Sequence, residues 1–377
     1  MEAYLDNSAT TRCLESVRDV VSKTMLEDYG NPSSKHMKGV ESERYLKDAR
    51  ETIAKTLKVN EKEIYFTSGG TESNNWALLG SAYASRRAGK HIITTAIEHA
   101  AVLMPLQFLA EQGYRITHLP VDEHGHISLA DLKAALDEET ILVSIMMVNN
   151  EIGAIEPVAE AGEIIKKYNP DILFHVDAIQ AYGKLPIYPK KQHIDLLSVS
   201  AHKIHGLKGA GALYVRQGLH IKPYLCGGGQ ENGLVSGTQA TPAIAAFGAA
   251  TAAVGDIRKN AERVSALRMR LVSGLREIAG IRVNSPENAL PYIVNISVEG
   301  IPSQVSVNFL SSQGVYVSAG SACAKGHRSP VLTAMGLCAS EIDTAVRISL
   351  SRETTEDEID ACINAIKTEV QTLRKKG

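Results

Sequence analysis

Seven short apolar runs, separated by longer helical patterns, constrain the fold of this chain more than any other feature. They lie at residues 63–67, 91–95, 114–121, 141–148, 172–178, 195–201 and 211–215. Each run is rich in apolar or β-branched residues and is bounded by Gly, Asp, Asn or Lys, which is typical of a buried strand. Segments between them, such as 74–87 and 103–112, have helical periodicity. This alternation predicts an α/β domain built on a mostly parallel, seven-stranded sheet.

The pattern changes after about residue 240. An Ala-rich segment, 241–255, is followed by an amphipathic stretch from Ile257 to Ala279, which we predict to be a helix leading out of the first domain. Short apolar runs then return, interrupted by one helix-like segment, at 281–285, 292–298, 303–312 and 346–351. We predict three parts: an N-terminal segment (1–14) that packs with the small domain, a large domain (15–260), and a smaller α+β domain (261–377).

Charge and cysteine content exclude several classes of protein. The 377 residues include 40 Lys+Arg and 42 Asp+Glu, a formal net charge of −2, so we expect no direct nucleic-acid binding. The five cysteines are odd in number and form no CxxC pair, which argues against disulfides and structural zinc. His124 and His126 lie in a polar turn without a third ligand nearby, and we expect no metal site. With neither a long apolar span nor a signal sequence, we expect a cytoplasmic protein that does not bind membranes.

A lysine ends one of the apolar runs. The predicted strand at 195–201 leads into His202, Lys203 and a Gly-rich turn. Desolvation at such a place lowers the pKa of a lysine and favours the neutral amine that a Schiff base requires. On Lys203 alone, a surface lysine at the start of a loop is the more frequent explanation.

An aspartate ends a neighbouring run. Asp177 closes the run at 172–178, and Gln180 follows three residues later. A buried carboxylate needs a cation or several donors, and the pyridinium nitrogen of pyridoxal phosphate (PLP) would serve. A helix N-cap is the alternative explanation. Lys203 follows Asp177 by 26 residues, a spacing that fits one βαβ step with both groups at the same sheet edge.

A third candidate joins a strand to a helix. The run at 63–67 leads into Ser68-Gly69-Gly70-Thr71 and then a helical pattern. N–H groups and hydroxyls at a helix N-terminus can bind an anion such as phosphate. The spacing of a Walker A motif is missing. A simple capping turn, with Thr71 or Ser73 as the cap, is equally compatible with this segment.

Ten motifs in one order carry a family resemblance. They are YLDNSATT (4–11), YGNPSSKH (29–36), FTSGGTESNN (66–75), TAIEHAAV (95–102), VNNEIGAIEP (148–157), HVDAIQ (175–180), SAHKIHGLKGAGAL (200–213), GGGQE (227–231), SGT (236–238) and SAGSAC (318–323). Together they resemble the PLP-dependent cysteine desulfurases of the NifS/IscS type, in the class V aminotransferase group. The resemblance implies PLP-dependent transferase fold type I, PLP as cofactor, L-cysteine as substrate and a homodimer.

The resemblance also assigns roles to residues. It implies that Lys203 binds PLP as a Schiff base, Asp177 pairs with the ring nitrogen and Gln180 with the ring hydroxyl. His99 would stack on the ring and exchange protons, as an imidazole can near neutral pH. The remaining contacts that it implies are Gly70, Thr71, Ser200 and His202 at the phosphate, Thr238 at the phosphate of the other subunit, Asn150 near the ring hydroxyl and substrate, and Arg347 at the substrate carboxylate.

Cys323 is the candidate reactive thiol. Small and polar residues surround it, and Lys325, His327 and Arg328 follow, a setting that favours the thiolate. The resemblance implies that Cys323 accepts the sulfur of L-cysteine as a persulfide. A sulfur-acceptor protein of an iron–sulfur cluster or tRNA-thiolation pathway would receive it next. We predict Cys338 and Cys362 to be buried core thiols, and we leave Cys13 and Cys226 open.

The chain departs from the usual family pattern at several positions. Asn232 and Val235 replace two arginines, Gln239-Ala240 replaces Glu-Asn, and Ser351 replaces a glycine. The changes at 232–240 favour one of the two alternatives that stay open beside a cysteine desulfurase, namely the scaffold described below. One is a PLP lyase of the same fold that acts on selenocysteine or another amino acid. The other is a degenerate homologue that serves as a binding scaffold. A plain aminotransferase would leave SAGSAC without a role.

Overall fold

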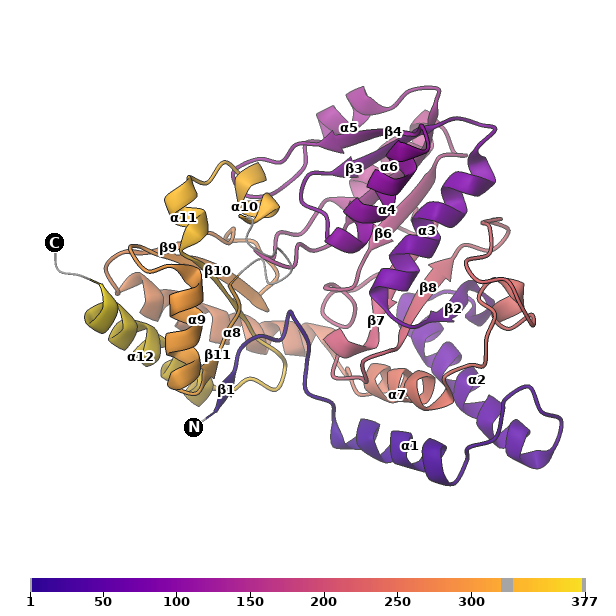
Figure 1. Cartoon of the computed structure of the whole chain (residues 1–377), viewed down its shortest axis with the longest axis horizontal. Coiled ribbons are helices and arrows are strands. Elements are labelled where there is room, and N and C mark those ends of the chain that lie inside the picture. Colours follow the sequence, from indigo (N-terminus) through magenta and orange to yellow (C-terminus); the bar gives the residue numbers. More distant parts are fainter. Residues whose placement is uncertain (1, 320–327, 375–377) are drawn as a thin grey trace.

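The computed structural model describes residues 2–319 and 328–374 (Figure 1). Its larger part contains the strands and helices from about residue 15 to about residue 255, and its smaller part contains the C-terminal elements together with the first strand of the chain. The predicted reactive thiol, Cys323, lies outside the described residues.

A seven-stranded sheet forms the centre of the larger part. Its strands are β2 (Ile64–Thr67), β3 (His91–Thr95), β4 (Arg115–Leu119), β5 (Thr140–Met146), β6 (Leu173–Asp177), β7 (Leu196–Ser200) and β8 (Gly211–Val215). Their order is β2-β8-β7-β6-β5-β3-β4, and β8 alone runs against the others. The predicted mostly parallel, seven-stranded sheet is therefore confirmed.

Helices cover both faces of this sheet. One face, which includes Phe174 and Val176, packs in the same core as α2 (Met37–Leu57), α6 (Val158–Tyr168) and α7 (Thr241–Ala252). The other face, which includes Leu173, packs against α3 (Gly70–Ser85) and α4 (Ala100–Glu111). Burial on both faces explains why these strands have continuous apolar runs in the sequence. Among the described residues, no helix is both long and apolar enough to cross a membrane.

The smaller part is an α+β unit. Its antiparallel sheet has the order β12-β10-β9. The strands are β9 (Ile281–Val283), β10 (Ile293–Val298) and β12 (Ala345–Ser349), and the longer helices are α8 (Ile257–Arg276), α9 (Ser303–Ser312) and α12 (Glu356–Leu373). Helix α8 continues across residues 260 and 261, where the sequence predicts a domain boundary. That boundary stays a prediction.

The N-terminal segment joins the smaller part. Strand β1 (Ala3–Tyr4) pairs in parallel with β11 (Val315–Tyr316), and Asp6 forms a bridge with Ser349 of β12. The chain then continues to α1 (Glu15–Leu26), which packs on α7 in the larger part. Residues 5–14 therefore connect the two parts.

The structure corrects one of the two buried-thiol predictions. Cys362 is fully buried in α12, and burial raises its pKa to about 12. Cys338, by contrast, is exposed, because it caps the short surface helix α11 (Ala339–Asp343), where its Sγ lies 3.0 Å from the hydroxyl of Ser340. Cys13 is half-buried and Cys226 is exposed.

Candidate active site

The sheet brings most of the predicted site residues to one edge. Strands β2, β3, β5, β6 and β7 all end there, because they run in the same direction. The residues that follow these strand ends are Gly70 and Thr71 after β2, His99 after β3, Asn150 after β5, Asp177 and Gln180 at and after β6, and Ser200, His202 and Lys203 at and after β7.

Asp177 is a buried carboxylate at the end of β6. Its Oδ2 accepts a hydrogen bond from Nδ2 of Asn74 at 2.7 Å, and its Oδ1 accepts one from the backbone N–H of Ile179 at 3.0 Å. Burial raises the pKa of Asp177, although these hydrogen bonds and the charges of His99 and Lys203 oppose the rise. A further cation beside this carboxylate would stabilise its ionised form.

Lys203 contacts the N-terminal segment. It ends the short helix η2 (Ala201–Lys203), directly after β7. Its Nζ donates hydrogen bonds to the backbone carbonyls of Ser8 and, at 2.9 Å, of Ala9. The carbonyl of Ser8 also accepts a hydrogen bond from Nε2 of Gln180 at 2.9 Å. The sequence predicted that this segment, which contains the motif YLDNSATT, packs with the small domain, but it predicted no contact with Lys203.

His99 is fixed by its position at a helix start. It caps α4, where its Nδ1 accepts a hydrogen bond from the N–H of Ala101 at 3.0 Å. Burial lowers the pKa of His99; the charge of Asp177 raises it and that of Lys203 lowers it. An imidazole that accepts at Nδ1 carries its proton at Nε2, which is then available for proton exchange.

Gly70 allows a helix terminus to approach the segment that follows Asp177. A Cβ atom at Gly70 would lie 2.1 Å from Cδ1 of Ile179, so a side chain there would clash. Thr71, the next residue, is exposed in the first turn of α3. The backbone N–H groups and the hydroxyl of this turn are suited to bind an anion.

The other residues predicted at the phosphate, namely His202, Ser200 and Thr238, lie outside the first turn of α3. Nδ1 of His202 lies 3.3 Å from the hydroxyl of Thr10, and burial lowers the pKa of His202 to about 4. The Ser200 hydroxyl donates to the carbonyl of Ala210 at 3.4 Å. Thr238 is exposed before α7, and among the described residues it makes no hydrogen bond to the others named here.

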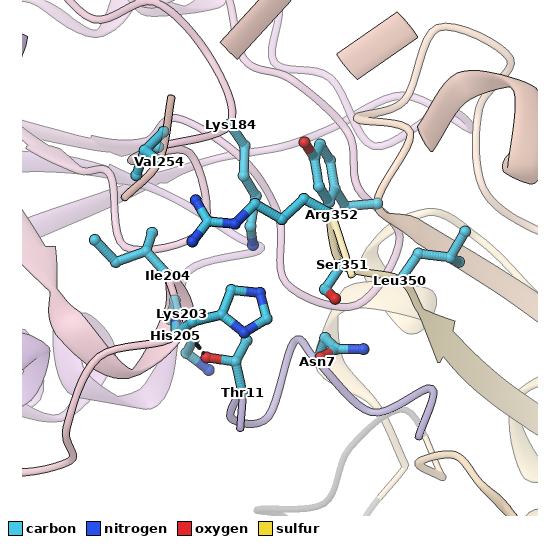
Figure 2. Close-up of a pocket in the computed structure, with 12 residues that line it drawn as sticks. Asn7, Thr11, Lys184, Lys203, Ile204, His205, Val254, Leu350, Ser351 and Arg352 are labelled. Atoms are coloured by element: carbon cyan, nitrogen blue, oxygen red, sulfur yellow. Dashed lines mark hydrogen bonds between the residues drawn. The ribbon is translucent and has the colours of Figure 1, made fainter. Parts of the chain in front are cut away.

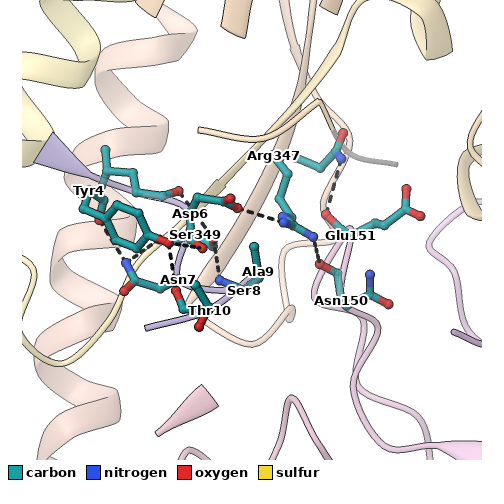
Figure 3. A network of polar contacts seen from close by, with 12 residues as sticks. Tyr4, Asp6, Asn7, Ser8, Ala9, Thr10, Asn150, Glu151, Arg347 and Ser349 are labelled. Atoms are coloured by element: carbon teal, nitrogen blue, oxygen red, sulfur yellow. Dashed lines mark hydrogen bonds and ion pairs between the residues drawn. The ribbon is translucent and has the colours of Figure 1, made fainter. Parts of the chain in front are cut away.

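Arg347 joins this edge from the smaller part of the molecule (Figure 3). Its Nη1 donates to the backbone carbonyl of Asn150 at 3.0 Å, and its Nη2 forms an ion pair with Asp6 at 2.8 Å. Its Nε is buried and has no hydrogen-bond partner within residues 2–319 and 328–374. The guanidinium thus retains a donor for a carboxylate ligand.

Glu151 is a second buried acid of the site, after Asp177, and it lies beside Arg347. The sequence analysis did not predict it. Glu151 accepts a hydrogen bond from the hydroxyl of Ser329 at 2.6 Å. Burial raises the pKa of Glu151 to about 7, while Ser329 and the charge of Arg347 oppose the rise. Its place in the motif VNNEIGAIEP was the only signal in the sequence.

The altered segment 227–240 is anchored by Glu231. This buried carboxylate accepts hydrogen bonds from both Nη atoms of Arg50 at 2.9 and 2.8 Å. It also accepts from the N–H of Phe66 at 2.9 Å and from Nε2 of Gln239 at 2.8 Å. Gln239, one of the departures from the family pattern, therefore takes part in holding the segment.

The other departures also fit their surroundings. Asn232 has φ +55°, in the left-handed region that asparagine tolerates better than most residues. Val235 forms a bridge with Leu225. The N–H of Ser351 donates to the hydroxyl of Thr354 at 2.9 Å. None of these positions breaks the local fold.

The residues of the sheet edge fit PLP. Lys203 supplies an amine for its carbonyl, and the buried Asp177 would gain a cationic partner in the pyridinium nitrogen. The approach of α3 to Ile179, possible only for a glycine at position 70, leaves the helix terminus beside the same segment for a phosphate.

Comparisons with known proteins agree with this geometry. The chain matches the family described as Aminotransferase class-V over residues 3–362. A cysteine desulfurase IscS of Methanosarcina thermophila is 44% identical over 375 residues, 98% of this chain and 92% of that protein. A solved structure of a NifS-like protein has a TM-score of 0.94 and 41% identity, covering 99% of this chain and 100% of that chain.

A solved structure of SspA in complex with cysteine has a TM-score of 0.84 and 34% identity, covering 94% of this chain and 100% of that chain. These matches extend over nearly the whole chain, and they confirm fold type I and PLP as the cofactor. The chain therefore belongs to the class V aminotransferase family and, within it, to the PLP-dependent cysteine desulfurases of the NifS/IscS type.

Proposed function

We propose that this chain converts L-cysteine to L-alanine and transfers the sulfur to Cys323 as a persulfide. One observation carries the proposal beyond family membership. The buried guanidinium of Arg347 contacts Asn150 at the edge where Lys203 and Asp177 lie, and its Nε lacks a partner among the described residues. A group suited to bind an amino-acid carboxylate thus adjoins groups that suit PLP.

The substrate carboxylate would bind the guanidinium of Arg347 through two parallel hydrogen bonds, a geometry that lysine cannot reproduce. When bound, PLP supplies the electron sink for the bond changes at Cα and Cβ of the substrate. The Nζ of Lys203 would remove the Cα proton, and Nε2–H of His99 would exchange a proton near the ring. Asn150 would orient the substrate.

The sulfur step balances without a further reactant. The Cys323 thiolate attacks the substrate sulfur, an S–S bond forms, and the C–S bond of L-cysteine breaks. The Cβ carbon that loses sulfur takes up one proton, Cα regains the proton held by Nζ of Lys203, and the products are L-alanine and a Cys323 persulfide. An acceptor protein of an iron–sulfur cluster or tRNA-thiolation pathway then receives the sulfur. A reducing cytoplasm suits such a thiol.

Two observations support a homodimer. Four large apolar side chains near the end of α1 and the start of α2 are exposed, namely Met25, Leu26, Tyr29 and Met37. Monomeric proteins rarely expose such clusters, which often mark a protein interface. Thr238 is also exposed. A residue that completes the phosphate site of a second subunit would be exposed in this way in one isolated chain. Analytical ultracentrifugation of the protein, with and without PLP, would test this assembly.

The function is tested by product analysis. Purified protein with PLP, L-cysteine and a reductant should release sulfide and alanine in equal amounts. Cys323→Ala should abolish sulfide release, whereas Cys338→Ala, which removes an exposed thiol, should not. Lys203→Ala should lose the absorption band of bound PLP.

Pyruvate in place of alanine would identify a β-elimination lyase, and activity with selenocysteine alone would identify the related lyase. A retained band without any product would identify a binding scaffold.

A further inference from the structure

A second lysine is buried close to Lys203. Lys184 lies four residues after Gln180, in the turn that follows β6, and is only 7% exposed. Its side chain lines the same small cavity as Lys203 (Figure 2). Its Nζ lies 3.4 Å from Oε1 of Gln180 and 5.6 Å from the ring centroid of Tyr292. A buried lysine amine with these partners requires an explanation, because burial of a charged amine is costly.

A chain of polar contacts links the two lysines. Lys184 donates to Oε1 of Gln180, Nε2 of Gln180 donates to the carbonyl of Ser8, and Lys203 donates to that same carbonyl. A lysine amine has donors and, when charged, no acceptor, so only the oxygen of the Gln180 amide can face Lys184. The NH2 group of Gln180 then faces the carbonyl of Ser8, to which Lys203 also donates.

The charges around Lys184 are mostly positive. The titratable groups that face it or share its cavity are Lys203, His202, His205, Arg347, Arg352 and Tyr292. Burial and the charges of Lys203 and Arg347 lower the pKa of Lys184 to about 7. The repulsion is mutual, so a charged Lys184 also disfavours the protonated form of Lys203.

We propose that Lys184 is a positioning residue of the cofactor site: it holds the NH2 group of Gln180 toward the Ser8 carbonyl that Lys203 also contacts, and the protonated form of Lys184 disfavours a proton on the amine of Lys203. The proposal rests on the proposed binding of PLP at Lys203. With PLP present, the oriented NH2 group of Gln180 would donate to the ring hydroxyl. An anionic hydroxyl accepts such a hydrogen bond, whereas the amide oxygen, in the flipped orientation, would repel it.

The test compares Lys184→Met, which removes the donor and the charge, with Lys184→Arg, which keeps both. Lys133→Met, at an exposed position on α5 (Leu129–Ala135), is the matched control. The readout is the pH midpoint of the PLP absorption band in each loaded protein. We expect Lys184→Met to raise the midpoint by roughly half to one pH unit, and the other two to leave it near the wild-type value.

A second measurement separates the amide orientation from the charge. In a double-mutant cycle, Lys184→Met should weaken PLP binding less in a Gln180→Leu background than in the wild type, because the amide is then absent. Competitive acetylation of Lys203 in the cofactor-free proteins reports the charge effect directly. In the cofactor-free protein, Lys184→Met should raise the apparent pKa of Lys203. If the Lys184→Met variant does not fold, Lys184→Gln takes its place.

The outcomes distinguish this proposal from the proposed function. A wild-type protein without the absorption band would overturn PLP binding at Lys203. A wild-type band with an unchanged midpoint in Lys184→Met and an unchanged acetylation profile would overturn the role of Lys184 alone. If Lys184→Met weakens PLP binding equally in the wild type and in the Gln180→Leu background, the orientation part of the proposal is rejected.

Discussion

The two sides of the site are built in different ways. The cofactor side consists of residues at the ends of buried parallel strands, such as Asp177 and Lys203. The substrate side is assembled from three distant segments, because Arg347 contacts Asp6 and Asn150, which lie 341 and 197 residues away in the sequence. A sheet edge holds its side chains rigidly, whereas contacts between separate parts depend on how those parts meet. Substitutions on the two sides should therefore have separable effects.

The largest effect is expected on the cofactor side. Asp177→Asn keeps the shape of the side chain but removes the charge that would pair with the pyridinium nitrogen. We expect kcat to fall by about 10²-fold or more, together with weaker PLP retention. Steady-state kinetics and PLP dissociation during gel filtration measure both. Unchanged PLP retention and kcat would remove Asp177 from the cofactor side.

The next effect should be confined to the substrate side. Arg347→Lys keeps the charge but loses the planar fork, so KM for L-cysteine should rise about 10- to 100-fold, with PLP retention unchanged. Arg328→Lys, in an exposed pair with Asp343, is the control and should leave KM at the wild-type value. Loss of PLP from the Arg347 variant at the same rate as from Asp177→Asn would contradict the separation of the two sides.

Asp6 should have a smaller effect of the same kind. Asp6→Asn removes the charge of the ion pair but can still accept from Nη2 of Arg347. We expect KM to rise by a few fold, and PLP retention to stay unchanged, because the guanidinium keeps its contact with Asn150. A KM below the wild-type value would instead show that Asp6 competes with the substrate carboxylate. Isothermal titration with a non-reactive cysteine analogue gives the same comparison at equilibrium.

The smallest expected effect is on stability, through Glu151. Its pKa is raised from 4.5 to about 7, so between these pH values the folded state binds more protons than the unfolded state. The free energy of unfolding should therefore fall as pH rises through this window. Glu151→Gln should remove this fall, gaining about 1–3 kcal/mol relative to the wild type by pH 8. Urea unfolding at pH 5 and pH 8 measures it.

The control for that measurement is Glu287→Gln, whose side chain is almost fully exposed. Glu156, which also has a pKa raised to about 7 by burial, is present in every variant and cancels in the comparison. A difference between wild type and Glu151→Gln that stays constant from pH 5 to pH 8 would show that Glu151 is ionised in the folded protein throughout.

The cofactor side could be predicted from sequence, because its residues follow strands that local pattern reveals. Asp177 and Lys203 each end an apolar run, and parallel strands bring such ends together. The contact of Lys203 with Ser8 has no local signature, since it depends on how residues 5–14 cross between the two parts of the molecule. The same holds for the ion pair of Asp6 with Arg347.

Cysteine burial shows the same limit. Cys362 lies on the apolar face of a long amphipathic helix, and its burial follows from periodicity. Cys338 lies in a short segment without such a pattern, and its exposure depends on where α11 packs. The role proposed for Lys184 also needed the structure, because only the fold reveals its contact with Gln180.

The location of the transferred sulfur tests the central claim most directly. The PLP-loaded protein is treated with L-cysteine without a reductant, blocked with an alkylating reagent, digested and measured by mass spectrometry. We predict one additional sulfur atom on the peptide that contains Cys323, and one alanine formed per persulfide. Additional sulfur on the exposed Cys226 or Cys338 instead, or alanine formed without any persulfide, would contradict the account.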